Sequence, residues 1–385
     1  MMSIPRQITS KTLKKLLQVE DFQNLDQQEI INLFLQDENI QKYAPDGICQ
    51  IDPRNGERVI FNSARAKRPH DNRPAESAPS LKLEEQECII CQGKTTSVVD
   101  IAPLSKGFTF INKNLFPIFF PFQLHSDHYI DDGSTITDTK GIPTQGMHLI
   151  QWTSSFHDRD WQNMPVNDLM IVLQRLASLE RTLINSFNGG YVSIIKNFGR
   201  LVGGSLIHGH QQICYSNVMP RKFHQNQVFQ DREGETFSNF MIKRNPEDYQ
   251  IRDYGPAVLL VPYFMRRPYD MLLLMKDQKK KYLHELNQDE IMAATLGWQD
   301  AIRAMLVIMP EIGREIAYNV TTNNGPGSGL YFEFLPYTQE TGGFEHLGLS
   351  LCQGNPGNVA EQIREILSHD LDNHFFNKKI KYKRK

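Results

Sequence analysis

A stretch with two histidines and two glutamines, His-Gly-His-Gln-Gln at 208–212, follows a segment with adjacent glycines and Ser205. Adjacent glycines let a backbone approach a ligand closely and expose N–H groups to anions. An imidazole is largely neutral near pH 7, and it can attack phosphorus to give a phosphoramidate that reacts further. The stretch therefore predicts a phosphate-transfer site, in which Gln212 can hydrogen-bond a phosphate oxygen without adding charge.

The pair of histidines has a second interpretation, because His-x-His also occurs in metal sites and at polar sheet edges. For an isolated pair that interpretation would be preferred. The adjacent glycines and Gln212 instead favour phosphate transfer. Alternate residues of a strand point to one face, so we expect His208, His210 and Gln212 to point the same way.

Two cysteines, Cys88 and Cys91, have the spacing of half a zinc site. The spacing is only a moderate signal, because pairs of buried cysteines are common. A zinc site would need two further ligands, and a bare thiol pair is the alternative.

The composition is that of an ordinary globular protein of 385 residues, 40% hydrophobic and 22% charged, with a formal net charge of −2. The length suffices for two domains or one duplicated domain. The small net charge gives no sign of a nucleic-acid partner, and the basic stretch at 378–385 is typical of a solvated terminus.

No apolar run approaches the roughly 18 residues that span a bilayer, and residues 1–20 lack the apolar core of a secretory signal. Five cysteines, an odd number, argue against a disulfide framework, so we expect a cytoplasmic protein without a membrane partner.

The rest of the sequence predicts two halves with one order of elements, namely two strands, a helix and two strands. In the first half we expect strands at 108–122 and 147–152, a helix at 167–186 capped by Asn167, and strands at 191–196 and 206–215. In the second half we expect strands at 257–262 and 271–275, a helix at 288–309 with a capping box of Asn287 and Glu290, and strands at 316–321 and 330–335. Residues 1–45 are helix-prone, and residues 70–87 predict a surface loop. The repeated order predicts an α+β fold made of a duplicated unit.

The sequence around the histidines resembles a known active-site pattern, Asn-x-Gly-(x)3-Gly-x-Ser-x-x-His-x-His-x-Gln. It is the pattern of the galactose-1-phosphate uridylyltransferase family, within the histidine-triad superfamily. In this chain it is carried by Asn197, Gly199, Gly203, Ser205, His208, His210 and Gln212. Other segments are similar to the family in the expected order, so that the resemblance covers roughly 50–370: 52–59, 65–69, 114–117, 261–263, 267–270, 318–319, 333–336 and 343–345.

The resemblance implies a fold of two histidine-triad-like units, with a mainly antiparallel sheet and flanking helices. It divides the chain into a helical extension at 1–45, a first half at 46–245 and a second half at 246–385. The first half would hold the active-site strand and a zinc site.

The resemblance also implies an enzyme, a nucleotidyltransferase that works through a covalent nucleotidyl-histidine. In the family the second histidine of the pair attacks the α-phosphorus of a nucleotide sugar, the sugar phosphate leaves, and a second sugar phosphate collects the nucleotide. By this match His210 is the nucleophile, and Gln212 contacts the phosphate beside it. The residues expected to contact the nucleotide, its phosphates or the sugar are Arg65, Arg68, Asn114, Asn197, Gly203, Ser205 and Glu345.

Three functions stay open. The first is transfer of uridylyl from UDP-glucose to a hexose 1-phosphate such as galactose 1-phosphate. The second is a phosphorylase on the same fold, in which orthophosphate attacks the nucleotidyl-histidine; its substrate would be a nucleoside-diphosphate sugar or a dinucleoside polyphosphate. The third is a non-catalytic nucleotide-binding protein, which an intact His-x-His-x-Gln disfavours. The base, the acceptor and the oligomeric state are not determined, with a homodimer as one alternative.

For zinc, the resemblance nominates His157 and His208 as the partners of Cys88 and Cys91. Such a site would be closed and structural, and it would clamp the histidine strand to the preceding loop. The histidines of the polar stretch at 125–128 lie outside every segment that matches the family, so we expect neither to be a ligand.

In two places the sequence departs from the family pattern. Many members carry a second His-x-His in the second half, where some bind a further metal, but this chain has Gly329 and Tyr331 there. We therefore do not expect a second metal site. Glu345 resembles a glutamate that holds hexose hydroxyls, yet residues 346–350 differ from the usual pattern, so the sugar is not determined.

Overall fold

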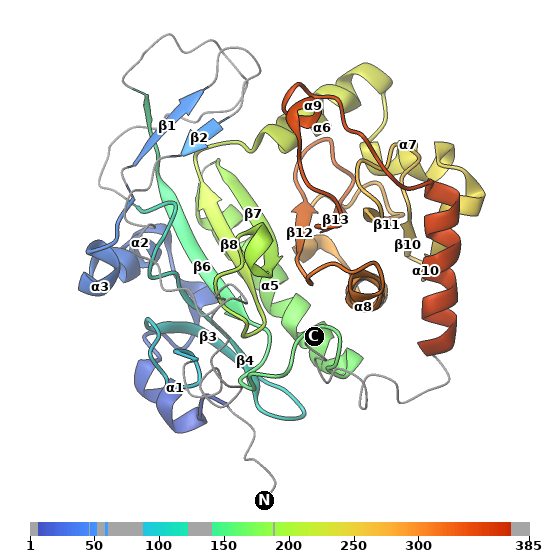
Figure 1. Ribbon diagram of the computed structural model, residues 1–385. Coiled ribbons are helices and arrows are strands. Elements are labelled where there is room, and N and C mark those ends of the chain that lie inside the picture. The colour runs from blue at the N-terminus through green and yellow to red at the C-terminus, as the bar shows by residue number, and fades with distance from the viewer. Residues whose placement is uncertain are drawn as a thin grey trace, which may run out of the picture.

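A ten-stranded sheet runs through the whole molecule in the computed structural model (Figure 1). The structure describes residues 7–45, 47–51, 58–60, 88–121, 141–187 and 189–370. The strands follow the order β3-β4-β6-β8-β7-β12-β13-β11-β10-β9, and all neighbours are antiparallel. Their bounds are β3 Val98–Pro103, β4 Phe108–Lys113, β6 Gly146–Trp152, β7 Tyr191–Phe198, β8 His210–Ser216, β9 Gln250–Asp253, β10 Ala257–Leu260, β11 Met271–Met275, β12 Tyr318–Asn323 and β13 Tyr331–Pro336. The predicted α+β class is confirmed.

The strand order shows that the sheet consists of two copies of one topology. From the outer edge inward, the first half runs β3-β4-β6-β8-β7, that is first, second, third, fifth and fourth along the chain. The second half repeats this order from the opposite edge as β9-β10-β11-β13-β12. In each half a long helix connects the third strand to the fourth, α5 (Val166–Ser186) and α8 (Gln288–Glu311). The predicted duplication is therefore present, and each half has one more edge strand than the sequence indicated.

The two halves meet where β7 pairs with β12 in the middle of the sheet. Asn197 lies opposite Asn319, and Asn319 Nδ2 donates to Asn197 Oδ1 at 2.8 Å. In the adjacent pair the rings of Phe198 and Tyr318 stack with their centroids 5.2 Å apart. Because backbone pairing crosses the boundary, the sheet is continuous from one half to the other.

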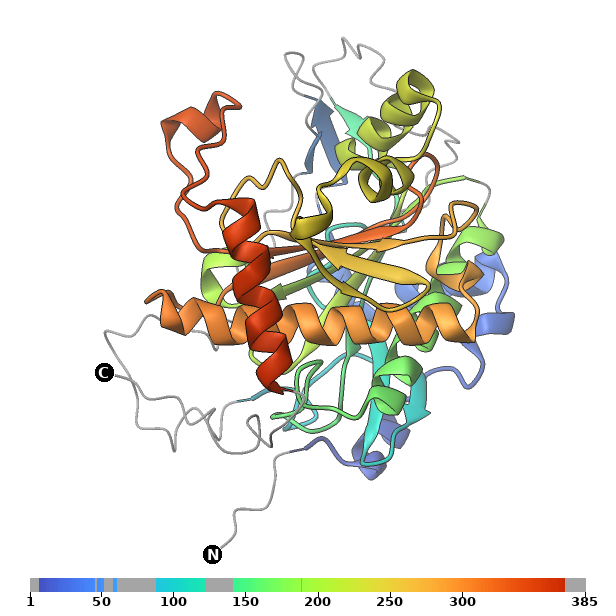
Figure 2. The ribbon, with the colours of Figure 1, turned by 90° about the vertical axis from the view of Figure 1, so that its right-hand side faces the viewer.

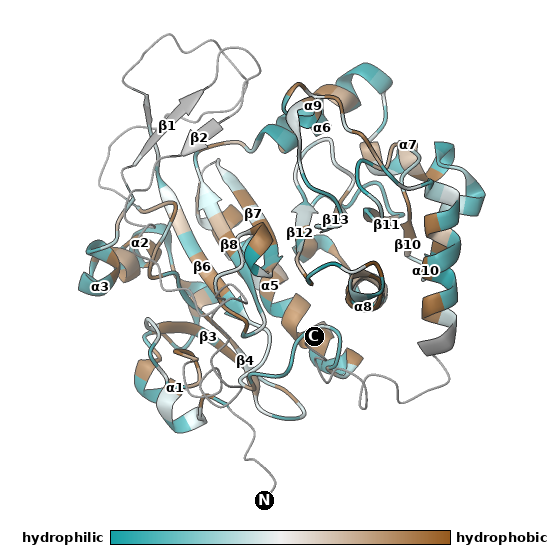
Figure 3. Ribbon diagram, in the orientation of Figure 1, coloured by the Kyte–Doolittle hydropathy of each residue, from teal (hydrophilic) through white to brown (hydrophobic). Residues whose placement is uncertain are grey.

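Helices α5 and α8 cover one face of the sheet and pack against each other (Figure 2). The predicted capping box starts α8: Glu290 N donates to Asn287 Oδ1 at 3.0 Å, and Asn287 N donates to Glu290 Oε2 at 2.7 Å. Among the described residues α8 alone is long and apolar enough to cross a bilayer, but 72% of its apolar window is buried, as in a core helix. Helix α10 (Pro356–Asp370) crosses α8 (Figure 2). Apolar and polar residues alternate along α10 (Figure 3).

The N-terminal helices wrap around the outer edge strand β3. Helix α1 (Ser10–Leu16) lies on the open face of the sheet, where Leu13 joins an apolar cluster with Trp152. Helices α2 (Gln27–Leu35) and α3 (Glu38–Gln41) lie on the other face, where Phe34 joins the main core. Between them Gln18 N donates to Val98 O at 2.9 Å. An edge strand presents unpaired backbone groups, so this segment, residues 7–41, covers the sheet edge on both faces; we call it the N-terminal clasp.

A buried cation anchors the N-terminal clasp. The Nζ of Lys113, whose side chain is fully buried, lies 2.8 Å from both Asp37 Oδ2 and Gln18 Oε1, and it donates to Leu33 O at 2.5 Å. Burial raises the pKa of Asp37, but the hydrogen bond and charge of Lys113 oppose this, and the net pKa is lowered. A buried ammonium needs such partners because its desolvation is costly.

The remaining elements lie around this core. A small three-stranded sheet contains β1 (Ile48–Ile51), β2 (Arg58–Ile60) and β5 (Ile142–Pro143). The halves are linked through α6 (Arg221–Glu233) and α7 (Phe237–Arg244), and α9 (Gly343–His346) follows β13.

Several predicted boundaries were wrong, and two of them have local reasons. The strand expected at 108–122 is shorter, because Asn114 Oδ1 accepts from Phe116 N at 2.9 Å and turns the chain, and Pro117 has no N–H for a ladder. Helix α5 begins directly after Pro165, whose fixed φ suits a helix start, so Asn167 lies inside the first turn and is not the cap.

We predict that Asp37→Ala lowers the free energy of unfolding by about 2 kcal/mol, because it leaves the buried Lys113 ammonium with neutral partners only. Since the pKa of Asp37 is lowered in the fold, this stabilisation is present at neutral pH and is lost as the pH falls below about 4. Urea denaturation at pH 7 and at pH 3.5 measures both effects. Glu38→Ala, an exposed neighbour on α3, is the control and should change stability by less than about 0.5 kcal/mol; equal effects of the two variants would contradict the prediction.

Candidate functional site

A pocket of about 80 Å³ opens on the face of the sheet opposite α5 and α8, where β4 and β6 end and β8 begins. Its walls come from these strands, from the turn that contains Ile89 and Ile90, and from Leu206. The structure brings four predicted site residues into the lining, namely Asn114, Ser205, His210 and Gln212.

His210 is the first residue of β8 and is buried beside Trp152, with the two ring centroids 5.1 Å apart. Its Nδ1 lies 2.8 Å from the carbonyl oxygen of His208. A carbonyl only accepts, so Nδ1 carries the proton and Nε2 has the lone pair. Burial lowers the pKa of His210 to about 4, against the opposite effect of that hydrogen bond. The ring is therefore neutral near pH 7 and has one nucleophilic nitrogen.

Gln212 is oriented by His148, a buried residue of β6 that no sequence motif marks. The backbone N–H of Ile118 donates to Nδ1 of His148 at 3.2 Å, which assigns the ring proton to Nε2. That Nε2 lies 3.0 Å from Gln212 Oε1. The amide oxygen of Gln212 is thus occupied by His148, and its NH₂ group is the part left to donate to a ligand. Asn114 Nδ2 lies 3.3 Å from Nδ1, the ring nitrogen with the lone pair, so the three side chains form one polar group.

The glycine segment before His208 is a short 3-10 turn at Arg200–Val202. Gly203 ends it in the left-handed conformation with φ of 84°, which glycine adopts without strain. At Gly199 a Cβ would lie 2.5 Å from the carbonyl oxygen of Ile316, so the close approach of the second half requires a glycine there. Asn197 accepts its hydrogen bond from Asn319 and is not in the pocket lining. Asn197 therefore lies at the junction of the two halves, and its predicted contact with the nucleotide stays a prediction.

The four predicted metal ligands, Cys88, Cys91, His157 and His208, come together at the base of this segment. The Sγ of Cys88 lies 3.7 Å from Nδ1 of His208, and the Sγ of Cys91 lies 3.6 Å from Nδ1 of both histidines. Zinc bonds of about 2.3 Å to sulfur and 2.05 Å to nitrogen, at a tetrahedral angle, would place these atoms about 3.6 Å apart. The hydrogen bond from Cys91, and then those from the histidines, lower the pKa of Cys88 against the opposing effect of burial. The geometry and charge fit a tetrahedral metal ion.

His208 is held on both sides. Its Nε2 lies 2.8 Å from Ser154 O and carries the proton, so that Nδ1 presents a lone pair to the metal cluster. The expectation that His208, His210 and Gln212 share one strand face was wrong in one respect, because β8 begins only at His210. The chain bends at His208, just before the strand, so the His208 ring turns to the cysteines while His210 and Gln212 line the pocket.

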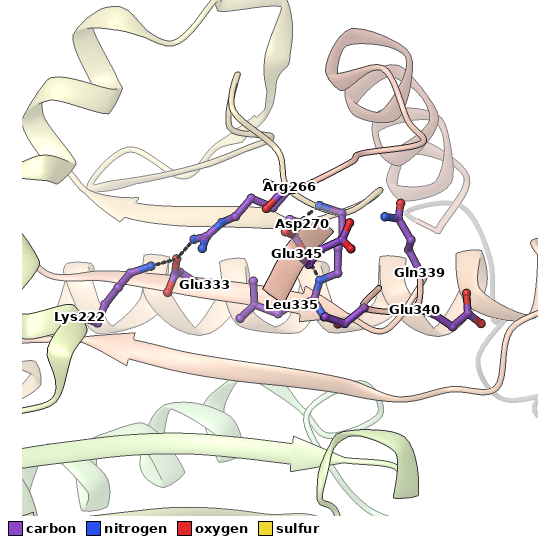
Figure 4. Close-up of a pocket in the computed structure, with 11 residues that line it drawn as sticks. Lys222, Arg266, Asp270, Glu333, Leu335, Gln339, Glu340 and Glu345 are labelled. Carbon is purple, nitrogen blue, oxygen red and sulfur yellow. Dashed lines mark hydrogen bonds and ion pairs between the residues drawn. The ribbon is translucent and has the colours of Figure 1, made fainter. Parts of the chain in front are cut away.

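Glu345 lies elsewhere, in a second pocket of about 260 Å³ formed by residues of the second half together with Lys222 of α6 (Figure 4). Its carboxylate accepts from Gly342 N at 2.9 Å and from Leu351 N at 3.1 Å. On the wall of this pocket Lys222 and Arg266 approach Glu333 at 2.8 and 3.8 Å. Within one chain, the structure therefore does not bring Glu345 together with His210.

Some predicted residues lie outside the described part of the chain, and one position of the second half carries a tyrosine in place of a histidine. Arg65, Arg68 and the histidines at 125–128 lie outside the described residues. Tyr331 begins β13 at the position that His210 has in β8, and its hydroxyl donates to Asn226 Oδ1 at 3.0 Å. Among the described residues the Cys88 cluster is the one group of three or more His, Cys, Asp or Glu side chains that fits a metal ion. In the second half a hydrogen-bonded tyrosine therefore stands at the position of His210, and the described residues of that half form no metal cluster.

We predict that elemental analysis finds about one metal ion per chain, and that Cys88→Ser or Cys91→Ser loses it. Because these ligands join three separate segments, the melting temperature should fall by about 5 °C or more. Cys352→Ser is the matched control, since Cys352 lies outside the cluster and should leave both values unchanged. A metal-free protein that melts at the same temperature would rule out the site.

No protein-family model matches the chain. In sequence the chain is similar to the ADP-glucose phosphorylase of Arabidopsis thaliana, with 23% identity over 355 residues that cover 86% of this chain and 95% of that protein. A solved uridylyltransferase has a TM-score of 0.64 and 17% identity, covering 84% of this chain and 99% of its own. An ADP-glucose phosphorylase from Arabidopsis thaliana, solved with bound ADP-glucose, has a TM-score of 0.57 and 17% identity, covering 82% and 98%.

The likeness to the solved structures shows the fold, and the sequence likeness to the phosphorylase extends over most of both chains. Together they confirm the resemblance indicated by the motifs: the chain has the fold of the solved uridylyltransferase and is similar in sequence to an enzyme, the ADP-glucose phosphorylase, along most of its length.

Proposed function

We propose that the protein is a nucleotidyltransferase that carries a nucleoside monophosphate on Nε2 of His210, taken from a nucleoside-diphosphate sugar. One observation carries the proposal: the His208 carbonyl holds Nδ1 of His210 at 2.8 Å, which leaves the lone pair of Nε2 free to attack in a pocket lined by Ser205 and Gln212. The sequence likeness to an ADP-glucose phosphorylase supports a nucleotide-sugar donor.

The reaction would take two displacements at one phosphorus atom. In the first, Nε2 of His210 bonds to the α-phosphorus while the bond to the bridging oxygen breaks, and the electron pair leaves with the sugar 1-phosphate. The substituted ring keeps its Nδ1 proton and is positively charged, so the hydrogen bond to the His208 carbonyl strengthens. In the second, a phosphate oxygen of the acceptor attacks, and the P–N electron pair returns to Nε2. The acceptor is already an anion and needs positioning rather than deprotonation.

Two acceptors fit this chemistry. A hexose 1-phosphate would make the protein a uridylyltransferase-like enzyme with UDP-glucose as donor, as the motif resemblance implies. Orthophosphate would make it a phosphorylase that releases a nucleoside diphosphate, and the likeness to the ADP-glucose phosphorylase favours this second candidate. A panel of UDP-, ADP- and GDP-glucose, each with orthophosphate or galactose 1-phosphate, distinguishes the two. No turnover with any pair would contradict both.

We assign the metal as zinc, because two thiolates and two imidazoles at tetrahedral spacing are a donor set that zinc prefers. All four positions would be filled by protein atoms, so the metal would be structural. Its contribution would be to fix His208, and through the His208 carbonyl the ring of His210.

We also propose a homodimer in which Glu345 of one copy serves a sugar bound near His210 of the other. The segment that carries Glu345 exposes four large apolar side chains, Phe344, Leu347, Leu349 and Leu351, each more than half exposed. Such a cluster is typical of an interaction surface. Light scattering should give a dimer mass of about twice 44.4 kDa, and Leu347→Glu with Leu349→Glu should give monomers with less than about a tenth of the activity. A monomeric parent that is fully active would contradict the dimer.

We predict that His210→Asn lowers turnover by about four orders of magnitude or more without changing the fold, because the nucleophilic nitrogen is removed. The circular dichroism spectrum and melting temperature should match those of the parent. His224→Asn, on α6 outside the pocket, is the control and should keep full turnover. Activity of the His210→Asn variant within tenfold of the parent would disprove the assignment of the nucleophile.

We further predict parallel double-reciprocal plots, because the first product leaves a covalent enzyme before the acceptor binds. Labelled sugar 1-phosphate should exchange into the donor without any acceptor present. Intersecting plots together with absent exchange would indicate direct transfer and exclude the covalent route.

A further inference from the structure

A buried ion pair lies beneath the nucleophile strand, and the proposed mechanism gives it no task. Lys196 of β7 and Asp160 of the segment before α5 approach at 2.7 Å between Nζ and Oδ2, with side chains only 1% and 6% exposed. The residue beside Lys196 in β7, Ile195, is paired with Gln212. Lys196 therefore lies next to the start of β8, on the face of the sheet that α5 covers.

The ammonium of Lys196 also holds the backbone of the nucleophile. Its Nζ donates to the carbonyl oxygen of His210 at 3.2 Å. The hydrogen bond of Nδ1 to the His208 carbonyl orients the ring of His210. The carbonyl of His208 is positioned by the metal cluster, and the carbonyl of His210 is positioned by the ion pair.

Asp160 is fixed by its own segment and by the second half. Its Oδ1 accepts from Trp161 N, and its N donates to Asn163 Oδ1, both at 2.9 Å. Gln299 of α8 donates to the carbonyl oxygens of Trp161 and Met164 at 2.9 Å each. The turn that carries the carboxylate is therefore anchored to the long helix of the other half.

The position of Asp160 also explains the glycine between the two histidines. A Cβ on Gly209 would lie 2.5 Å from Cγ and 2.8 Å from Oδ1 of Asp160. Its φ is not among the positive values, so the requirement comes from packing and not from backbone conformation. The His-Gly-His stretch and the ion pair thus form one packed unit.

A buried ion pair is not usually needed for stability, because an apolar pair of similar volume is often as stable or more stable. The contacts to His210 and Gly209 give this pair a different task. We propose that Lys196 and Asp160 are positioning residues, which hold the His210 backbone so that Nε2 stays in line with the phosphorus it attacks. A displacement of the reacting group by about 1 Å can lower the rate about a hundredfold, even when the substituted residue does not touch the substrate. This role rests on the proposed function of His210.

The test compares single variants with an apolar pair. Lys196→Met and Asp160→Leu each leave one buried charge without its partner and should lower the urea midpoint, whereas the double variant removes both charges and should regain the parent midpoint. The rate of nucleotidyl-enzyme formation is then measured in single turnovers with UDP-glucose and ADP-glucose labelled at the α-phosphorus. The double variant should lose at least tenfold in this rate while its KM for the donor stays within threefold of the parent.

A double variant that regains stability and also forms the covalent enzyme at the parent rate would show that the pair is only structural, and would overturn the proposal. The pair Arg252→Met with Asp300→Leu, which removes an ion pair in the second half, is the control and should not change the rate. If the double variant does not fold, Gly209→Ala gives the answer: it should lose tenfold or more in rate with its metal retained, and a full rate would overturn the proposal. A parent protein that forms no covalent adduct would instead contradict the proposed function itself, and this role with it.

Discussion

The hydrogen bond between Nδ1 of His210 and the carbonyl oxygen of His208 is the interaction on which the site depends. It selects one tautomer of a buried ring and so leaves the lone pair on Nε2, the nitrogen that attacks in the proposed mechanism. A hydrogen bond of this kind orients a ring only if the accepting backbone is itself fixed. The metal cluster fixes it from one side, because His208 is held by Ser154 O and by the two cysteines. The Lys196 ammonium holds the carbonyl oxygen of His210 itself.

The duplicated fold places one active half against one supporting half. The topology is the same in both, yet the position of His210 is taken by Tyr331, which is buried and hydrogen-bonded to Asn226. The second half instead contributes strand β12, which closes the centre of the sheet, and Gln299, which anchors the turn of Asp160. On the outer side the N-terminal clasp covers the edge strand and neutralises Lys113. The nucleophile strand is therefore supported from both neighbours in the sheet and from the helix layer beneath it.

Much of this could be predicted where the information is local in the chain. The central strands and the capping box of α8 depend on residues close in sequence, and the structure places them as expected. Of the motif from Asn197 to Gln212, the structure brings Ser205, His210 and Gln212 into the pocket, whereas Asn197 lies at the junction of the halves. The metal cluster needed the family resemblance, since nothing in the spacing of Cys88 and Cys91 points to His157. The contacts of His148 with Gln212, and of Asp160 with Lys196, depend on strand register and on the path of a loop. No local pattern marks these contacts. The one sign in the sequence is Lys196, which falls among the alternate residues of β7 that point to the buried face, where a lysine is unusual and needs a partner.

The most direct test of the account is the chemical position of the nucleotide on the protein. The enzyme would be incubated with a donor labelled at the α-phosphorus, quenched in alkali, digested, and the modified peptide examined by mass spectrometry and by phosphorus–nitrogen NMR. The account predicts a nucleotide on residue 210, attached through Nε2 with Nδ1 unmodified. Attachment through Nδ1, attachment to another residue, or no covalent nucleotide at all would contradict it.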